Sequence, residues 1–146
     1  MRNVSLFFLT FMLLGMVTKA QTKHTIGEKF GGGVVFEVSA DGLHGLISET
    51  KDQGICMLSE AKTLIAKPEN HSEAGKAFTD WKVPAKDELN TLYKNKVSMD
   101  GFVSGLYLSS SLVNSNRACN FQDFSNGKQT YQQLNTKVNV RAIRAF

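Results

Sequence analysis

Short apolar runs separated by polar turns make up the last third of the chain. Residues 106–111 (LYLSSS), 118–121 (ACNF) and 140–146 (VRAIRAF) carry apolar and aromatic side chains over a few consecutive positions, which predicts strands. Residues 124–128 (FSNGK) are typical of a turn. Because a free apolar end would fray, we expect the last residues to be buried in a sheet. The pattern therefore predicts a mainly antiparallel sheet that includes the C-terminal strand.

The N-terminal part of the chain predicts a β-hairpin. Residues 34–38 (VVFEV) form a β-branched and aromatic run, and residues 43–47 (LHGLI) form a second run that can return beside it. Asp41 and Gly42 between them are a turn signal. The glycines at 31–33 precede a strand and lack the Gly-Lys-Ser/Thr of a phosphate loop. We expect them to allow a close backbone approach instead.

Two middle segments show helical periodicity. The first is expected to have Ser59 as its N-cap and to run through Lys67, and the second to run from Lys86 to about Lys96. The apolar positions are Leu58, Ala61, Leu64 and Ile65 in the first segment and Leu89, Leu92, Tyr93 and Val97 in the second.

The second helix lacks a capping side chain. Its N-cap position is Ala85, which offers no side-chain acceptor, whereas a serine or threonine there would typically contribute about 1 kcal/mol. With Glu88 three residues on, such a residue would complete a capping box.

The predicted strands and helices are segregated along the chain, which predicts an α+β fold: a hairpin, two helices and then the sheet.

The first twenty residues predict a secretory signal peptide. Arg2 is followed by an uncharged apolar run from Val4 to Val17, and Ala20 precedes the expected cleavage point. A membrane anchor is the alternative, but the run is short for a bilayer. We therefore expect a secreted or periplasmic protein with one domain at 21–146 and no stable membrane span after cleavage.

Charge gives little indication of a polyanionic partner. The whole chain carries 17 basic and 13 acidic residues, a net charge of +4, and two of the basic residues (Arg2 and Lys19) lie in the predicted signal peptide. Fifteen basic residues then remain against 13 acidic ones, which leaves +2. No run of Lys or Arg is dense enough to predict nucleic-acid binding.

Cys56 and Cys119 are the only cysteines, and an even number in an exported protein suggests a disulfide. Two buried free thiols are the alternative. No histidine stands at ligand spacing from either cysteine, so no metal site is predicted.

A polar set between the last strands is the candidate ligand-binding surface. Its side chains can meet sugar hydroxyls, and Asp123 can contribute to a Ca²⁺ site, although such sites normally collect several oxygen ligands. An ordinary polar loop surface is the alternative. The set comprises Asn114, Asn116, Arg117, Asn120, Gln122, Asp123 and Asn126.

Other reactive side chains are expected to be structural. The serines at 109–111 lack a G-x-S-x-G elbow. Arg141 and Arg144 stand three apart on the expected terminal strand and should point to opposite faces. At least one should be partly buried and paired with a carboxylate or carbonyls.

Five successive parts of the chain resemble the motifs of one protein family. They are 30–36 with 41–46 (G-G-x-V-F, then G-x-H-G-L), 81–89 (W-R-L-P-T-x-x-E-L), 107–111 (Y-W-S-S-S), 124–127 (F-S-x-G) and 140–146 (V-R-A-V-R-A-F). The family is domain of unknown function 1566, which includes the C-terminal domain of a bacterial collagen-like adhesin. The chain departs from its pattern at Ala85, and at Met57, Leu108 and Cys119 where the family has tryptophan.

The resemblance implies a C-type-lectin-like α+β fold and no catalytic residues. It implies an exported bacterial binding or adhesion module that contacts a glycan or a cell-surface protein. The alternatives are a structural subunit of a surface assembly, or a thiol-dependent enzyme on a lectin-like scaffold that uses Cys56 or Cys119. The departures from the family pattern also allow the hypothesis that the substitutions are coupled. In this hypothesis the two small cysteines occupy neighbouring sites that were formerly bulky, and they form a disulfide that recovers stability.

Overall fold

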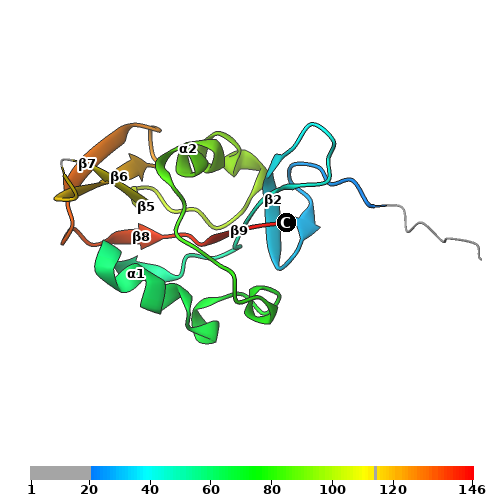
Figure 1. Ribbon diagram of the computed structural model, residues 1–146, viewed down its shortest axis with the longest axis horizontal. Helices are drawn as coiled ribbons and strands as arrows, with labels where there is room; N and C mark the ends of the chain where they lie inside the picture. The colour runs from blue at the N-terminus through cyan, green and yellow to red at the C-terminus, as the bar shows by residue number, and fades with distance from the viewer. Residues whose placement is uncertain (1–20, 114) are drawn as a thin grey trace, which may run out of the picture.

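The computed structural model describes residues 21–113 and 115–146, so the predicted signal peptide at 1–20 lies outside the described residues. The chain has an α+β fold with two helices and largely antiparallel sheets (Figure 1). The helices are α1 (Leu58–Ile65) and α2 (Lys86–Lys94), with 3₁₀ turns at Pro68–Asn70, Gly75–Ala77 and Lys96–Ser98. The strands are β1 (Lys29–Phe30), β2 (Gly33–Val38), β3 (Gly45–Ser48), β4 (Gly54–Cys56), β5 (Leu106–Val113), β6 (Ala118–Asp123), β7 (Gln129–Gln133), β8 (Val138–Val140) and β9 (Ile143–Ala145).

The strands form two sheets rather than one. The first has the order β1-β2-β3-β9 and the second the order β4-β8-β5-β6-β7. The predicted hairpin is confirmed, since β2 and β3 pair antiparallel. The expected close approach is also present, because a Cβ on Gly33 would overlap the carbonyl oxygen of Ser48. The pairing of β5 with β8 is parallel, at Tyr107 and Asn139.

The C-terminal segment links the two sheets, which corrects the prediction of one terminal strand over 140–146. β8 and β9 follow one another through the middle of the molecule (Figure 1). Between them, the N–H of Ala142 donates to the side-chain oxygen of Gln53, and its carbonyl accepts the N–H of Glu49 at 3.0 Å. The backbone at this point therefore bonds to the loop after β3 and leaves the strand ladder.

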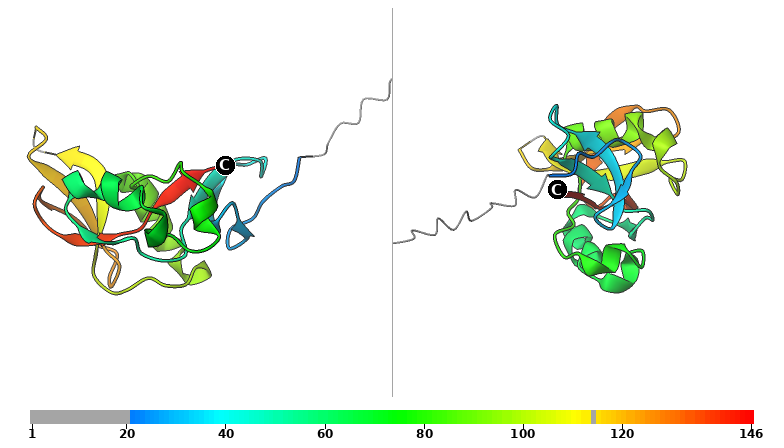
Figure 2. Two further views of the ribbon diagram at one scale, coloured as in Figure 1. Left: turned by 90° about the horizontal axis from the view of Figure 1, so that it is seen from below. Right: turned by 90° about the vertical axis from the view of Figure 1, so that its right-hand side faces the viewer.

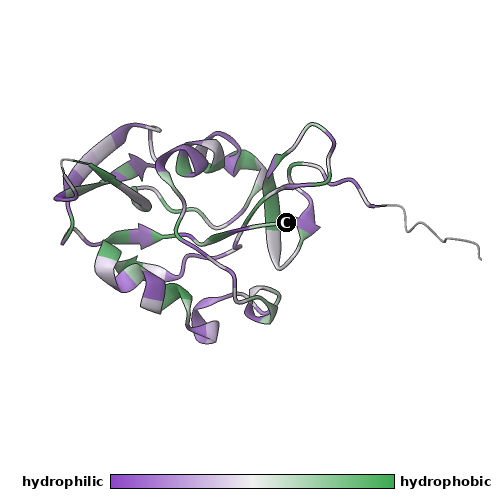
Figure 3. Cartoon of the chain, in the orientation of Figure 1, coloured by the Kyte–Doolittle hydropathy of each residue, from purple (hydrophilic) through white to green (hydrophobic). Residues whose placement is uncertain are grey.

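The core lies on both faces of the strands because neighbouring strand residues point to opposite sides. Tyr107 packs with Phe36 and Leu89 on the side of α2, whereas the adjacent Leu108 packs with Phe121 on the side of α1. The two helices accordingly lie on opposite sides of the strands (Figure 2). Apolar and polar residues alternate along both helices and most strands (Figure 3). Each fully buried large side chain contributes roughly 1.5–3 kcal/mol.

The start of α2 is as predicted, but its end is not. Ala85 occupies the N-cap, and the carboxylate of Glu88 accepts its N–H at 2.7 Å. The helix ends at Lys94 because the side chain of Asn95 donates to the carbonyl of Phe36 at 3.0 Å and turns the chain. Val97, expected on the apolar face, is consequently 93% exposed.

The predicted boundaries of α1 also need correction. Met57 rather than Ser59 occupies the N-cap, and the carboxylate of Glu60 accepts the N–H of Met57 at 3.3 Å. The helix stops at Ile65, before the expected Lys67, because a residue that precedes a proline disfavours helical geometry. Within the described ranges, neither helix is long and apolar enough to cross a bilayer.

Candidate functional site

The two cysteines do not form the expected disulfide. Cys56 lies on β4 and Cys119 on β6, both buried and both as free thiols. The sheet order places β8 and β5 between them. Neighbouring strands are about 4.8 Å apart, so three strand steps exceed the roughly 7 Å between Cα atoms that a disulfide spans. The bridge hypothesis fails because these sites are not neighbours in the sheet.

The departures from the family pattern at Leu108 and Cys119 lie in the interior. Both side chains are fully buried, in the same apolar cluster on the α1 side. An aromatic ring at either position would therefore contribute to the core and would have no access to a ligand.

The predicted polar set does not form one surface. Asn120 and Gln122 are buried by the packing of β6 against β5 and α2. The side-chain amide of Asn120 donates to the carbonyl of Ser111 at 3.1 Å. That of Gln122 donates to the side-chain oxygen of Asn90 at 2.9 Å and to the carbonyl of Gly127. These two residues hold the hairpin together and are corrected to structural residues.

Asp123 and Asn126 form the turn between β6 and β7. One carboxylate oxygen of Asp123 accepts the N–H of Ser125 at 2.9 Å and also its hydroxyl. The other accepts the side-chain amide of Asn126 at 3.0 Å. The bonds from Ser125 hold the pKa of Asp123 below its usual value. Among the described residues, no group of three or more His, Cys, Asp or Glu side chains gathers around a possible metal position.

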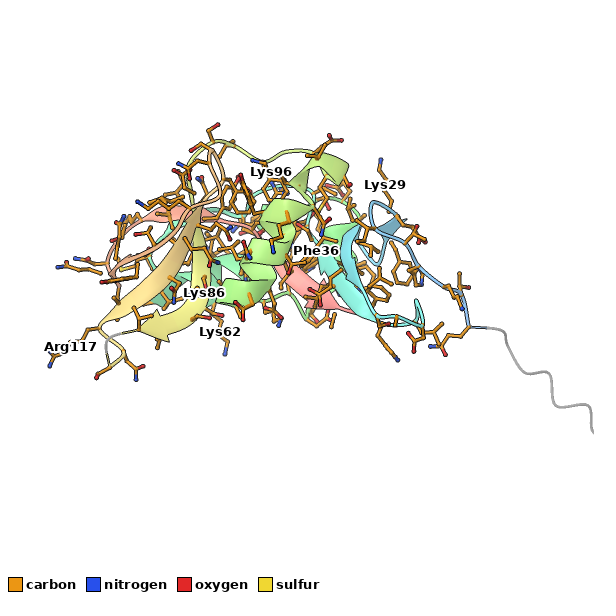
Figure 4. All side chains as sticks on the ribbon, turned by 90° about the horizontal axis from the view of Figure 1, so that it is seen from above. Lys29, Phe36, Lys62, Lys86, Lys96 and Arg117 are labelled. Carbon is orange, nitrogen blue, oxygen red and sulfur yellow. The ribbon has the colours of Figure 1, made fainter. Side chains whose placement is uncertain are left out.

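Asn116 and Arg117 lie at the opposite end of β6, in the turn that follows β5, and Asn114 lies outside the described residues. Asn116 has a φ of +68°, a left-handed conformation that asparagine tolerates in turns. Arg117 projects from the tip of this hairpin, away from the body of the molecule (Figure 4).

A shallow groove of about 590 Å³ lies beside this tip. Its lining brings Arg117 together with a segment that follows from β7 into the next turn. The ring of Tyr131 is 60% exposed on β7, where its backbone position opposes Asn120 of β6. The groove thus combines an exposed aromatic ring with guanidinium and amide groups. Its lining residues are Arg117, Ala118, Tyr131, Gln132, Gln133, Leu134 and Asn135.

The hydropathy pattern did not predict β7, which together with the turn after it supplies most of the lining of this groove. The strand reads QTYQQ and is hydrophilic along its length (Figure 3). With three glutamines in five residues, β7 does not show the alternation of apolar and polar positions that normally marks a strand. The available signal was Thr130 beside Tyr131, two residues with strand preference, bounded by Gly127 before them and Asn135 after them.

The serine run on β5 supports α2. The hydroxyl oxygen of Ser111 accepts the N–H of Lys86 at 2.9 Å, and so supplies from a strand an acceptor for the first amide of the helix. The N–H of Ser110 donates to the carbonyl of Pro84 at 2.8 Å. The fully buried Ser109 accepts the N–H of Ser111 through its hydroxyl oxygen.

Both arginines of the terminal segment are paired with carboxylates, which confirms the expectation that at least one of them would be. Arg141 is buried, donates from Nε to Asp52 at 2.7 Å and from its Nη atoms to the carbonyls of Glu49 and Gly101. Arg144 forms a bidentate ion pair with Asp80, in which Nε donates to Oδ1 at 2.7 Å and Nη2 donates to Oδ2 at 3.0 Å. They anchor loops rather than a ligand site.

Comparison of the chain with models of protein families finds no match, and comparison with curated proteins finds none either.

Proposed function

We propose that this protein is an exported, non-catalytic module with a C-type-lectin-like fold, and that it binds a glycan at the groove beside Tyr131. The arrangement of an opening hairpin, two helices and a terminal strand paired into a sheet supports the lectin-like assignment. Export is supported by the apolar run in residues 1–20.

The exposed ring of Tyr131 in a groove of polar side chains carries the proposal. An aromatic face offers an apolar platform for the C–H face of a sugar ring, and the guanidinium of Arg117 with the amides of Gln133 and Asn135 can bond to its hydroxyls. The groove is shallow and lies on an outer hairpin, which suits a chain or a surface better than an enclosed small molecule.

The state of the possible nucleophiles supports a non-catalytic role. Burial raises the pKa of both the Cys56 and the Cys119 thiols, so that they stay protonated at neutral pH. The hydroxyl oxygens of Ser109 and Ser111 accept backbone N–H groups in the native structure. These side chains are engaged in the fold, which argues against the thiol-dependent enzyme.

A glycan array with matched variants tests the proposal. Tyr131→Ala should weaken binding about tenfold, whereas Tyr131→Phe, which keeps the ring, should bind almost as the wild type does. Arg117→Ala should also weaken binding. Lys29→Ala removes an exposed cation from β1, far from the hairpin tip (Figure 4), and should have no effect.

Two results would overturn the glycan assignment. One is a wild-type protein that binds no glycan, and the other is equal binding by Tyr131→Ala and Lys29→Ala. Binding to a purified surface protein that is lost in Tyr131→Ala would instead assign the groove to a protein partner.

A further inference from the structure

A second, more enclosed cavity lies beside α1. It has a volume of about 640 Å³ and lies between α1 and the segment that leads from the first 3₁₀ turn to Val83. Leu58 and Ile65 of α1 line one wall, and Phe78 and Trp81 line the other. Cavities of this size, mostly apolar with a few polar groups, are typical of small-molecule sites.

The inner wall of the cavity is held rigidly. The ring of His71 is hydrogen-bonded on both sides: Nδ1 lies 2.9 Å from the carboxylate of Glu49, and Nε2 lies 2.6 Å from the carbonyl oxygen of Ile65. It stacks on Trp81 with the ring centres 5.5 Å apart. The indole N–H of Trp81 donates to the carbonyl of Gly75 at 3.0 Å. The apolar face is therefore already in place before a ligand arrives.

The charged groups that line the cavity are cationic. Lys62, Lys76 and Lys82 contribute to its lining, and no aspartate or glutamate does so within the described ranges. The carboxylate beside this wall, that of Glu49, lies behind the His71 ring and does not line the cavity.

The three lysines are not equivalent. Lys76 is paired with Glu73 at 2.5 Å and Lys82 with Glu88 at 2.6 Å. Among residues 21–113 and 115–146, no carboxylate lies within ion-pairing distance of Lys62. Its ammonium group is therefore the one best placed to receive an anion at the mouth of the cavity.

We propose that this cavity binds a small amphipathic carboxylate, with the apolar chain between Ile65 and Trp81 and the carboxylate at Lys62. The apolar walls take the chain, because its burial removes hydrocarbon from water. The cationic lining selects the anionic head group over a cationic one. This site is separate from the glycan groove, which lies on β6 and β7.

The intrinsic fluorescence of the protein reports on this site. Trp81 is the only tryptophan of the chain, and it lines the cavity. Decanoate, titrated below its micelle concentration, should cause a saturable change in tryptophan emission. Decyltrimethylammonium, which has the same chain length with a cationic head, should bind at least tenfold more weakly.

Variants separate the two halves of the proposal. Lys62→Ala should weaken decanoate binding about tenfold, whereas Lys67→Ala, an exposed lysine just beyond α1 that does not line the cavity, should leave it unchanged. Ala66→Phe places a ring at the lining from the end of α1 and should abolish binding of both probes. Tyr131→Ala should not alter decanoate binding, because Tyr131 does not line this cavity. The glycan proposal and the carboxylate proposal can therefore fail independently of each other.

The proposal is overturned if decanoate gives no saturable change and no heat by calorimetry. It is also overturned if both head groups bind equally, or if Lys62→Ala and Lys67→Ala behave alike. Thermal unfolding of each variant identifies any that fail to fold, and Lys62→Ala, at an exposed helical position, should unfold at the wild-type temperature.

Discussion

Replacing Ser111 with alanine removes the acceptor that β5 supplies to the first turn of α2. The N–H of Lys86 then loses its partner at 2.9 Å. The backbone contacts of Ser111 remain, since its carbonyl still accepts the amide of Asn120 and its N–H still donates to Ser109. The substitution therefore isolates one side-chain hydrogen bond.

We expect Ser111→Ala to lower the free energy of unfolding by about 1 kcal/mol. A neutral hydrogen bond contributes roughly 0.5–1.5 kcal/mol net, and loss of a helix cap costs a similar amount. For a domain of this size the melting temperature should fall by about 4 °C. Urea unfolding followed by circular dichroism measures the change, with an unaltered slope as the sign that the unfolded state is unaffected.

Two further variants sharpen this test. Ser59→Ala, at an exposed position in the first turn of α1, should change stability by less than about 0.5 kcal/mol. Ala85→Ser should stabilise α2 by about 0.5–1 kcal/mol. The gain should be the same in the Ser111→Ala background, because an N-cap serine accepts the N–H of the second or third helical residue and not that of Lys86. If Ser111→Ala matched Ser59→Ala, the capping role of Ser111 would be refuted.

Three other perturbations follow from the buried polar groups. Arg141→Met should destabilise the protein by about 3–5 kcal/mol in urea unfolding, because it leaves Asp52 without its cationic partner and the carbonyls of Glu49 and Gly101 without their donor; a loss below about 1 kcal/mol would contradict this. Burial acts to raise the pKa of Glu49, but hydrogen bonds from Ser72, Thr50 and His71 outweigh it and hold the pKa below the ordinary 4.5. The ionised Glu49 therefore stabilises the fold above about pH 4.5, and this stabilisation is lost as the pH falls through the lower pKa of the folded state. The loss of stability in acid should accordingly be shallower in Glu49→Gln than in the wild type. Equal losses in the two proteins would contradict this role of Glu49. Adding dithiothreitol should leave the unfolding midpoint unchanged, because Cys56 and Cys119 are separate thiols; a loss of about 2–5 kcal/mol would reveal a bridge.

Chemistry that depends on neighbours in the sequence was predictable. The Asp41-Gly42 turn, the start of α2 at Lys86 and the segregation of strands from helices all rest on contacts between nearby residues. The pairing of Arg141 was also expected, because a guanidinium within an apolar run needs acceptors. Its partner Asp52 was not identifiable, since 89 positions separate the two residues.

The binding surface was harder to predict than the fold. Polar residues recur between 116 and 126, yet Asn120 and Gln122 are buried by β5 and α2, and Asp123 closes a turn. Polarity alone does not distinguish a side chain that bonds to the protein from one that faces a ligand. Tyr131 was overlooked because its strand contains three glutamines and lies at the edge of a sheet.

The sequence by itself determined the α+β class, the opening hairpin, the cores of both helices and the run of short strands at the end, because hydrophobic periodicity and turn residues act over a few positions. Only the tertiary structure decided how the terminal segment divides between two sheets, and that Ser111 supports a helix 25 positions away. It also decided that Cys56 and Cys119 are held apart, and that Lys62 and Trp81 line one cavity. These features depend on which distant segments pack together, and no local pattern encodes that pairing.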